Sequence, residues 1–209
     1  MTIGSRRRLC YLLAVQKRCL PLLALVFLTL TPATHAAHLQ PPVREIVISV
    51  KRQTMTVLEG GTCKAKFPVS TSKFGVGDQS RSFRTPLGAF RIEKKVGANR
   101  PSGSVFKGLH FTGEVVAANS PGRDPIVTRV LCLSGGSAGR RGIYIHGTPE
   151  EKRIGTPASY GCIRMRSRDV IALFNAVPVG TRVVITDSPP THYAAAASTG
   201  STHDTDWYR

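Results

Sequence analysis

The chain has 209 residues, which is enough for one domain of ordinary size with terminal extensions. Its 20 glycines and 14 prolines favour a turn-rich β protein over a helical bundle, and a hydrophobic fraction of 41% is compatible with a packed core. The 29 Lys and Arg residues against 12 Asp and Glu give a net charge of +17, which predicts an anionic surrounding.

Residues 1–36 are typical of a secretory signal peptide. Five basic residues and no acidic one precede the apolar run 20–30, and small residues follow it. The run has 11 residues, whereas a membrane-spanning helix needs about 20, so we expect cleavage after Ala36 rather than a permanent anchor. The protein would then be exported to the periplasm or cell wall, touching the membrane only through the signal segment before cleavage.

Removal of this segment leaves a net charge of +12, from 24 basic and 12 acidic residues. For an exported protein, this charge favours anionic wall polymers or membrane surfaces over nucleic acid. Three cysteines remain, Cys63, Cys132 and Cys162, so at least one thiol is unpaired and is a candidate reactive group. Cys63 and Cys132 lie on predicted strands, and either a disulfide between them or two reduced thiols fits the sequence.

After a linker (37–44), the predicted domain (45–187) begins with β structure. Alternating apolar residues predict a first strand, and two β-rich runs around a Gly-Gly turn predict a hairpin; the three runs are 46–50, 55–58 and 62–69. Pro68 indicates that the last strand lies at a sheet edge or a bulge.

Further along the chain, polar glycine-containing segments predict loops at 70–84 and 97–108. Apolar runs predict strands at 89–92, 126–133, 142–145 and 182–185. One helix is predicted after Ser167, which we expect to be its N-cap, with Asp169 near the positive helix end. Residues 188–209 lack periodicity and predict a disordered tail. The pattern therefore predicts one mostly β domain with one or two short helices.

One stretch is most informative about chemistry: His146-Gly147-Thr148 and, ten residues later, Ser159-Tyr160-Gly161-Cys162-Ile163-Arg164-Met165. A thiol nucleophile needs a base, a group that orients the base, and donors for the developing oxyanion. Cys162 could be the nucleophile, and His146, held at the end of an apolar strand, the base. Gly161 permits a tight turn whose amide groups could face the substrate carbonyl, and Arg164 suits a substrate carboxylate.

Each of these residues has an ordinary structural explanation when taken alone. A buried cysteine is more often a small apolar residue than a nucleophile, a histidine at a strand end is commonly a hydrogen-bonded surface residue, and Arg164 could be a solvated charge. Their combination with an odd number of thiols in an exported protein favours a cysteine hydrolase or transferase.

The same stretch resembles the signature of the L,D-transpeptidase (YkuD-like) catalytic domain family. Other segments resemble family elements in the expected order, over about residues 45–186: Pro68-Val69-Ser70-Thr71, Thr85-Pro86-Leu87-Gly88-Ala89-Phe90, Arg168-Asp169-Val170 and Gly180-Thr181-Arg182-Val183. The resemblance implies a β-sandwich-like fold and a cysteine that attacks a peptidoglycan tetrapeptide stem between diaminopimelate and D-alanine. An amine then resolves the acyl-enzyme, in cell-wall cross-linking or remodelling.

By matching position, the resemblance implies that Cys162 is the nucleophile, that His146 accepts and returns the proton, and that the Gly147 carbonyl orients the imidazole. It also implies that Ser159, Tyr160 and Arg164 line the site. Many family members have histidine where this chain has Tyr160, which is no base near neutral pH, so proton transfer would fall on His146 alone. Peptidoglycan stem peptides are the implied partners, with anionic wall polymers as further candidates, and neither nucleic acid nor a cofactor is expected.

Three alternatives stay open from the sequence. An L,D-carboxypeptidase or other hydrolase on the same scaffold would use identical catalytic residues. A non-enzymatic basic module that binds the wall or nucleic acid is disfavoured, because the basic residues are scattered and aromatics are only 7%. A zinc site built from Cys132, His146 and Cys162 is disfavoured by their spacing, so no metal is expected.

Overall fold

The computed structural model describes residues 44–188. The predicted signal peptide lies outside the described residues, as do the linker and the tail except for their boundary residues 44 and 188. No helix within 44–188 is long and apolar enough to cross a membrane.

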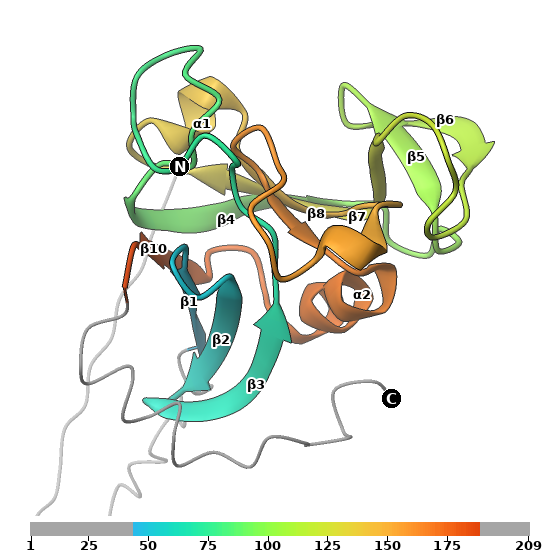
Figure 1. Ribbon diagram of the computed structural model, residues 1–209. Coiled ribbons are helices and arrows are strands. Elements are labelled where there is room, and N and C mark those ends of the chain that lie inside the picture. Colours follow the sequence, from blue (N-terminus) through green and yellow to red (C-terminus); the bar gives the residue numbers. More distant parts are fainter. Residues whose placement is uncertain (1–43, 189–209) are drawn as a thin grey trace, which may run out of the picture. The chain divides into compact units, whose positions relative to one another are not determined.

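Ten strands form one mixed sheet, in which β1 and β10 run parallel, as do β8 and β9. The main order is β3-β2-β1-β10-β4-β7-β5-β6, and β8 joins β7 and then β9. Figure 1 shows the ribbon, and the strand bounds are β1 (Arg44–Ser49), β2 (Thr54–Glu59), β3 (Thr62–Pro68), β4 (Gly88–Val96), β5 (Ser104–Lys107), β6 (His110–Val115), β7 (Ile126–Ser134), β8 (Tyr144–Gly147), β9 (Ile163–Met165) and β10 (Arg182–Thr186).

The main core lies between two parts of this sheet, as in a sandwich. Ile46 on β1 and Met55 on β2 belong to the same buried apolar cluster as Leu131 on β7 and Ile145 on β8. Helix α2 (Ser167–Ala176) adds Leu173 to the cluster. In Figure 1, β1, β2 and β3 lie below β4, β7 and β8, with α2 alongside. The expected mostly β, sandwich-like fold with short helices is confirmed.

The first predicted hairpin is confirmed. β2 and β3 pair antiparallel around the Gly60-Gly61 turn, and both glycines have positive φ, 57° and 80°. β3 is the outermost strand of the order, which agrees with Pro68 because proline cannot donate a ladder hydrogen bond.

The prediction of a loop over 97–108 is wrong in its second half. Residues 104–107 form β5, which pairs with β6 in a hairpin that projects from the body in Figure 1. Gly108 and Leu109 at its tip both have positive φ, 56° and 66°, as a type I′ turn requires. Leucine rarely adopts this conformation, and the turn lacks the Asn-Gly pair that usually indicates it. The hairpin could therefore not be predicted from its turn residues.

The predicted helix is confirmed, but Ser167 is not its N-cap. α2 begins at Ser167, and Arg166 occupies the cap position without a side-chain hydrogen bond. The backbone N–H of Ser167 instead donates to Glu151 Oε1 at 2.7 Å. Glu151 belongs to a 3₁₀ helix, η1 (Glu151–Arg153), so a carboxylate from another element satisfies the positive helix end. A second helix, α1 (Ala138–Arg141), is short, and the sequence did not predict its position.

Candidate active site

The two faces of β7, β8 and β9 have different surroundings. Side chains alternate along a strand, so Leu131, Ile145 and Ile163 enter the main core. The opposite face carries Cys132 beside Tyr144 and then His146 beside Arg164, according to the strand registers. The candidate catalytic residues therefore lie on the face of the sheet that does not contact the main core.

Cys162 directly precedes β9. Because Ile163 pairs with Ile145, Cys162 lies beside Tyr144 at the start of β8. Its Sγ donates to the carbonyl oxygen of Gly142 at 3.7 Å. Burial raises the pKa of the Cys162 thiol, while the Tyr144 backbone amide and nearby arginines oppose this without offsetting it. The resting group at neutral pH is therefore a protonated thiol.

His146 is buried on β8, with 5% of its surface exposed. Its Nδ1 lies 2.8 Å from the carbonyl oxygen of Gly147, the contact that the resemblance implied. A carbonyl oxygen only accepts, so Nδ1 carries the hydrogen and Nε2 is left as the basic nitrogen. Burial, opposed by this hydrogen bond and assisted by the charge of Arg164, lowers the pKa of His146 to about 4. The imidazole is therefore neutral near pH 7.

Cys162 and His146 occupy diagonal positions on adjacent strands. Cys162 lies beside Tyr144, which is two residues from His146 and points to the same face. Diagonal neighbours in a sheet are separated by roughly 7–8 Å, a gap that an imidazole and a thiol side chain can close. In this structure the thiol hydrogen bond goes to Gly142, and catalytic contacts commonly tighten only when substrate binds.

The turn before Cys162 is held by three hydrogen bonds. Ser159 Oγ donates to the Cys162 carbonyl at 2.6 Å and accepts from the Gly161 N–H at 3.2 Å. Thr85 Oγ1 donates to the Gly161 carbonyl at 3.1 Å. Gly161 has φ 118°, and a Cβ there would lie 3.2 Å from the Arg84 carbonyl oxygen, so the position requires glycine. Since its N–H is occupied by Ser159, Gly161 could serve as an oxyanion donor only if that contact opened.

Arg164 has internal partners in this structure. Its side chain is 9% exposed and forms ion pairs with Asp124 and, at 3.3 Å, with Glu150. It also donates to the Ala158 carbonyl oxygen at 3.3 Å. Ser159 is fully buried and Tyr160 is 55% exposed, so of the three predicted substrate-binding residues only Tyr160 presents its side chain to solvent. Contact between substrate and these residues stays a prediction.

The sequence reasoning missed two residues around Arg164. Thr148 Oγ1 donates to Asp124 Oδ1 at 2.5 Å, and it accepts from the Glu150 N–H at 3.0 Å. Thr148 stands in the quoted His-Gly-Thr motif and could have been singled out there. Asp124 lies in a polar loop 40 residues before Arg164, and nothing local marks it.

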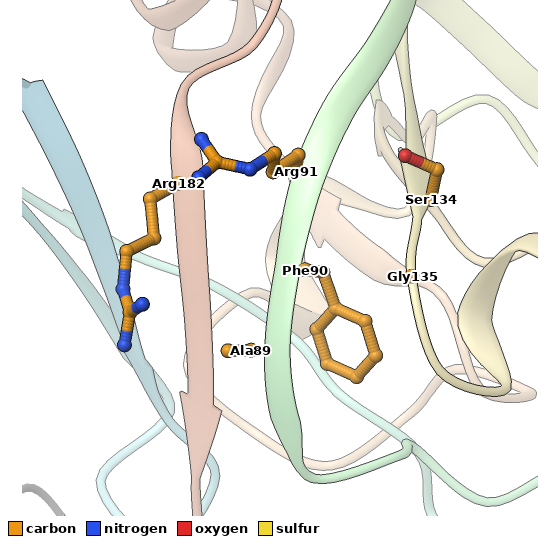
Figure 2. A pocket seen from close by; sticks show the side chains of 6 residues that line it. All are labelled: Ala89, Phe90, Arg91, Ser134, Gly135 and Arg182. Atoms are coloured by element: carbon orange, nitrogen blue, oxygen red, sulfur yellow. The ribbon is translucent and has the colours of Figure 1, made fainter.

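Two other features do not form a competing site. In the described part of the chain, no three His, Cys, Asp or Glu side chains gather as metal ligands would. A pocket of about 190 Å³ opens where β4, β7 and β10 meet, smaller than the roughly 300–1,000 Å³ of ligand pockets. None of the predicted site residues lines it; Figure 2 shows its lining of Ala89, Phe90, Arg91, Ser134, Gly135 and Arg182.

Comparison with known proteins identifies the family of this chain. A family model described as the L,D-transpeptidase catalytic domain matches residues 43–185. The chain belongs to this family. The resemblance read from the motifs is thereby confirmed, and the L,D-transpeptidase family is one of transferases. The alternative of a non-enzymatic basic module loses support.

Among L,D-transpeptidase relatives, YqjB of Bacillus subtilis (strain 168) is 29% identical over 142 residues, covering 68% of this chain and 70% of the relative. ErfK/SrfK of Escherichia coli (strain K12) is 56% identical over 45 residues, which are 22% of this chain and 14% of the relative. A crystal structure of an L,D-transpeptidase from Mycobacterium tuberculosis H37Rv has a TM-score of 0.48 at 19% identity, covering 69% of this chain and 58% of that one. This chain therefore spans less than two thirds of that solved chain.

Proposed function

We propose that this protein is an exported peptidoglycan L,D-transpeptidase in which Cys162 forms an acyl-enzyme with a tetrapeptide stem and passes the acyl group to an amine. The observation that carries the proposal is the hydrogen bond between His146 Nδ1 and the Gly147 carbonyl. This hydrogen bond leaves Nε2 of His146 free to act as a neutral base. His146 on β8 and Cys162, just before the adjacent strand β9, lie on the same face of the sheet. Along β8 and β9, side chains of the main core alternate with the candidate catalytic side chains, which supports a site built on rigid elements.

The proton balance of the reaction runs through His146 alone. The Cys162 thiol gives its proton to Nε2 while sulfur attacks the carbonyl carbon of the bond between diaminopimelate and D-alanine. The C–N bond breaks, His146 returns the proton to the departing D-alanine amine, and a thioester stays on Cys162. An acceptor amine then attacks the thioester carbon and gives a proton to His146. The C–S bond breaks, and the proton returns to sulfur.

The cellular compartment and the binding partners are also part of the proposal, and both rest on the sequence. A cleaved signal peptide would place the domain in the periplasm or cell wall, where stem peptides are available. The net charge of +12 without residues 1–36 would favour contact with anionic wall polymers. The same catalytic residues would serve an L,D-carboxypeptidase, in which water replaces the amine acceptor.

The test is incubation of the mature protein with a defined tetrapeptide stem, with and without an amine acceptor, followed by mass analysis of enzyme and products. We expect a thioester adduct, release of D-alanine and a cross-linked product. Hydrolysis product alone, even with acceptor present, would replace the transferase with the hydrolase. Adduct formation with a carbapenem-type β-lactam should be lost in Cys162→Ala.

The matched control is Cys132→Ala, which removes a thiol from the same sheet face. It should keep the adduct. A covalent adduct on Cys162→Ala would refute the assignment of the nucleophile.

A further inference from the structure

Three aromatic side chains form an exposed cluster beside the candidate nucleophile. Phe74, Phe83 and Tyr160 are 46%, 55% and 55% exposed. Their ring centroids lie 5.8–6.3 Å apart, so each ring contacts the other two. Tyr160 is two residues before Cys162, yet no step of the acyl transfer uses these rings. We call the three side chains the aromatic surface.

The backbone under the aromatic surface is tied together. Ser72 Oγ donates to the Phe83 carbonyl oxygen at 2.6 Å and accepts from the Phe74 N–H at 3.0 Å. Ser72 also forms a β-bridge with Ser159, next to Tyr160. Phe74 and Phe83 come from one loop and Tyr160 from the turn before Cys162, and hydrogen bonds connect the backbone of these two segments. A ligand would therefore meet the three rings already arranged.

Phe83 is held in an unfavourable conformation. Its φ is 56°, in the left-handed region that bulky residues avoid. Strained conformations persist only where the surroundings impose them, and they cluster at ligand-binding sites. Since more than half of Phe83 is exposed, core burial does not explain the strain.

The ammonium group of Lys73 lies at the edge of the aromatic surface. Lys73 Nζ donates to the Tyr160 hydroxyl at 2.9 Å and lies 4.3 Å from the centre of that ring. It is also 5.3 Å from the centre of the Phe74 ring. One of its three N–H groups is used by Tyr160, which leaves donors for oxygen atoms of a ligand. The rings are tilted by 43–86° to one another, and apolar walls with a few fixed polar groups are features of small-molecule sites.

We propose that the aromatic surface binds a sugar ring of the glycan to which the stem peptide is attached. This inference rests on the proposed function. A stem of small and charged amino acids has no large apolar side chain to cover three rings, whereas a sugar presents a flat face of C–H groups to aromatics and oxygen atoms to Lys73. Exposed apolar clusters of this kind mark interaction sites.

The dimensions of the substrate agree with this location. An extended chain spans about 3.3–3.6 Å per residue, so a three-residue stem between the scissile bond and the sugar reaches roughly 10 Å. The aromatic surface begins two residues from Cys162 and continues over rings about 6 Å apart. A sugar at the far end of the stem therefore falls within its reach.

The test compares a free tetrapeptide stem with the same stem carrying its disaccharide. The wild-type protein should show a kcat/KM roughly tenfold higher for the disaccharide substrate, which is the size of one favourable aromatic contact. In Phe74→Ala and Phe83→Ala, this ratio should fall towards one. Val179→Ala, which removes an exposed apolar side chain outside the aromatic surface, should keep it. Calorimetric affinities of the two ligands for Cys162→Ala should show the same preference without turnover.

A wild-type ratio of one, or a ratio unchanged in both phenylalanine variants, overturns the inference. If these variants keep the ratio but lose cosedimentation with anionic phospholipid vesicles, the aromatic surface is a membrane contact and the inference is wrong. Failure of the wild-type protein to turn over either substrate contradicts the proposed function, whereas turnover of both at equal rates contradicts only the sugar site.

Discussion

Arg164→Lys separates two roles for Arg164, which lies two residues after the candidate nucleophile Cys162. In the structure its guanidinium bridges Asp124 and Glu150 and also reaches the Ala158 carbonyl oxygen. Lysine keeps the charge but offers a single compact ammonium in place of a planar fork. Its donors share one nitrogen, so they do not reproduce the separate Nη2 and Nη1 contacts with Asp124 and Glu150, and we expect one charged contact to be lost.

The expected loss can be estimated from this geometry. A hydrogen bond to a charged group contributes about 1.5–3 kcal/mol, so Arg164→Lys should lower the free energy of unfolding by about 2 kcal/mol. For a chain of this size, that corresponds to a fall in Tm of about 4–8 °C. A solvated surface arginine would change the free energy by only about 0.5 kcal/mol.

The assay combines stability with kinetics. Thermal unfolding of Arg164→Lys, Asp124→Asn and the double variant gives a coupling energy, which we expect to exceed about 1 kcal/mol because the side chains are in contact. Steady-state kinetics at matched folded fraction, on a stem with free and with amidated carboxylates, then tests substrate contact. A substrate anchor predicts roughly a thirtyfold fall in kcat/KM that disappears on the amidated stem.

An unchanged Tm together with additive effects of Arg164→Lys and Asp124→Asn would refute the internal role. A kinetic loss of equal size on both forms of the stem would remove Arg164 from substrate binding. It would leave Arg164 as a positioning residue for the loops that hold Asp124 and Glu150.

Three further predictions concern the turn, the base and the thiols. Gly161→Ala should cost about 1–3 kcal/mol in chemical denaturation and impair acylation, because φ is 118° and the new Cβ meets the Arg84 carbonyl; an undiminished stability would contradict the geometry of the turn. For His146, burial lowers the pKa to about 4 from 6.5. Between these pH values the unfolded chain binds a proton that the folded protein does not, so the free energy of unfolding should fall by about 3 kcal/mol as pH decreases through this window. Urea unfolding at several pH values should show this dependence in the wild type but not in His146→Gln, and equal slopes would show that His146 is not a buried neutral base. The mature protein, denatured without reductant, should titrate with three thiols, since Cys63, Cys132 and Cys162 are unpaired; a count of one would indicate a disulfide.

Local signals in the sequence were enough for several elements. The Gly60-Gly61 turn between two β-rich runs predicted β2 and β3, and Pro68 predicted the sheet edge. Ser167 and Asp169, as signals of a helix start, predicted α2. In each case the residues that specify the element lie within it, so a short window contains the information.

Features that combine distant segments could not be predicted in this way. The aromatic surface joins Phe74, Phe83 and Tyr160, whose contact depends on a β-bridge between Ser72 and Ser159. In the sequence, Phe74 and Phe83 are isolated aromatic residues within a polar loop. This loop has no regular spacing of apolar residues from which their positions could be predicted. The N-cap of α2 was mispredicted for a similar reason, because the group that satisfies the helix end comes from Glu151 on η1.

The missed hairpin accounts for the different expectation about Arg164. In the structure, Arg164 pairs with His146 and lies on the same sheet face, away from the main core. Residues 97–108 were predicted to be a loop, but Phe106 on β5 and Phe111 on β6 pack in one apolar cluster with Cys132 on this face. The segment after β6 then brings Asp124 to Arg164.

The burial of His146 determines the protonation state of this candidate base. His146 is buried on a face that carries no main core, and the charge of Arg164 acts on it there. Both the burial and the positive charge disfavour the imidazolium, so they lower the pKa of His146 together. Arg164, fixed by its two carboxylates, can therefore contribute to keeping His146 neutral and able to accept the thiol proton, without itself touching the substrate.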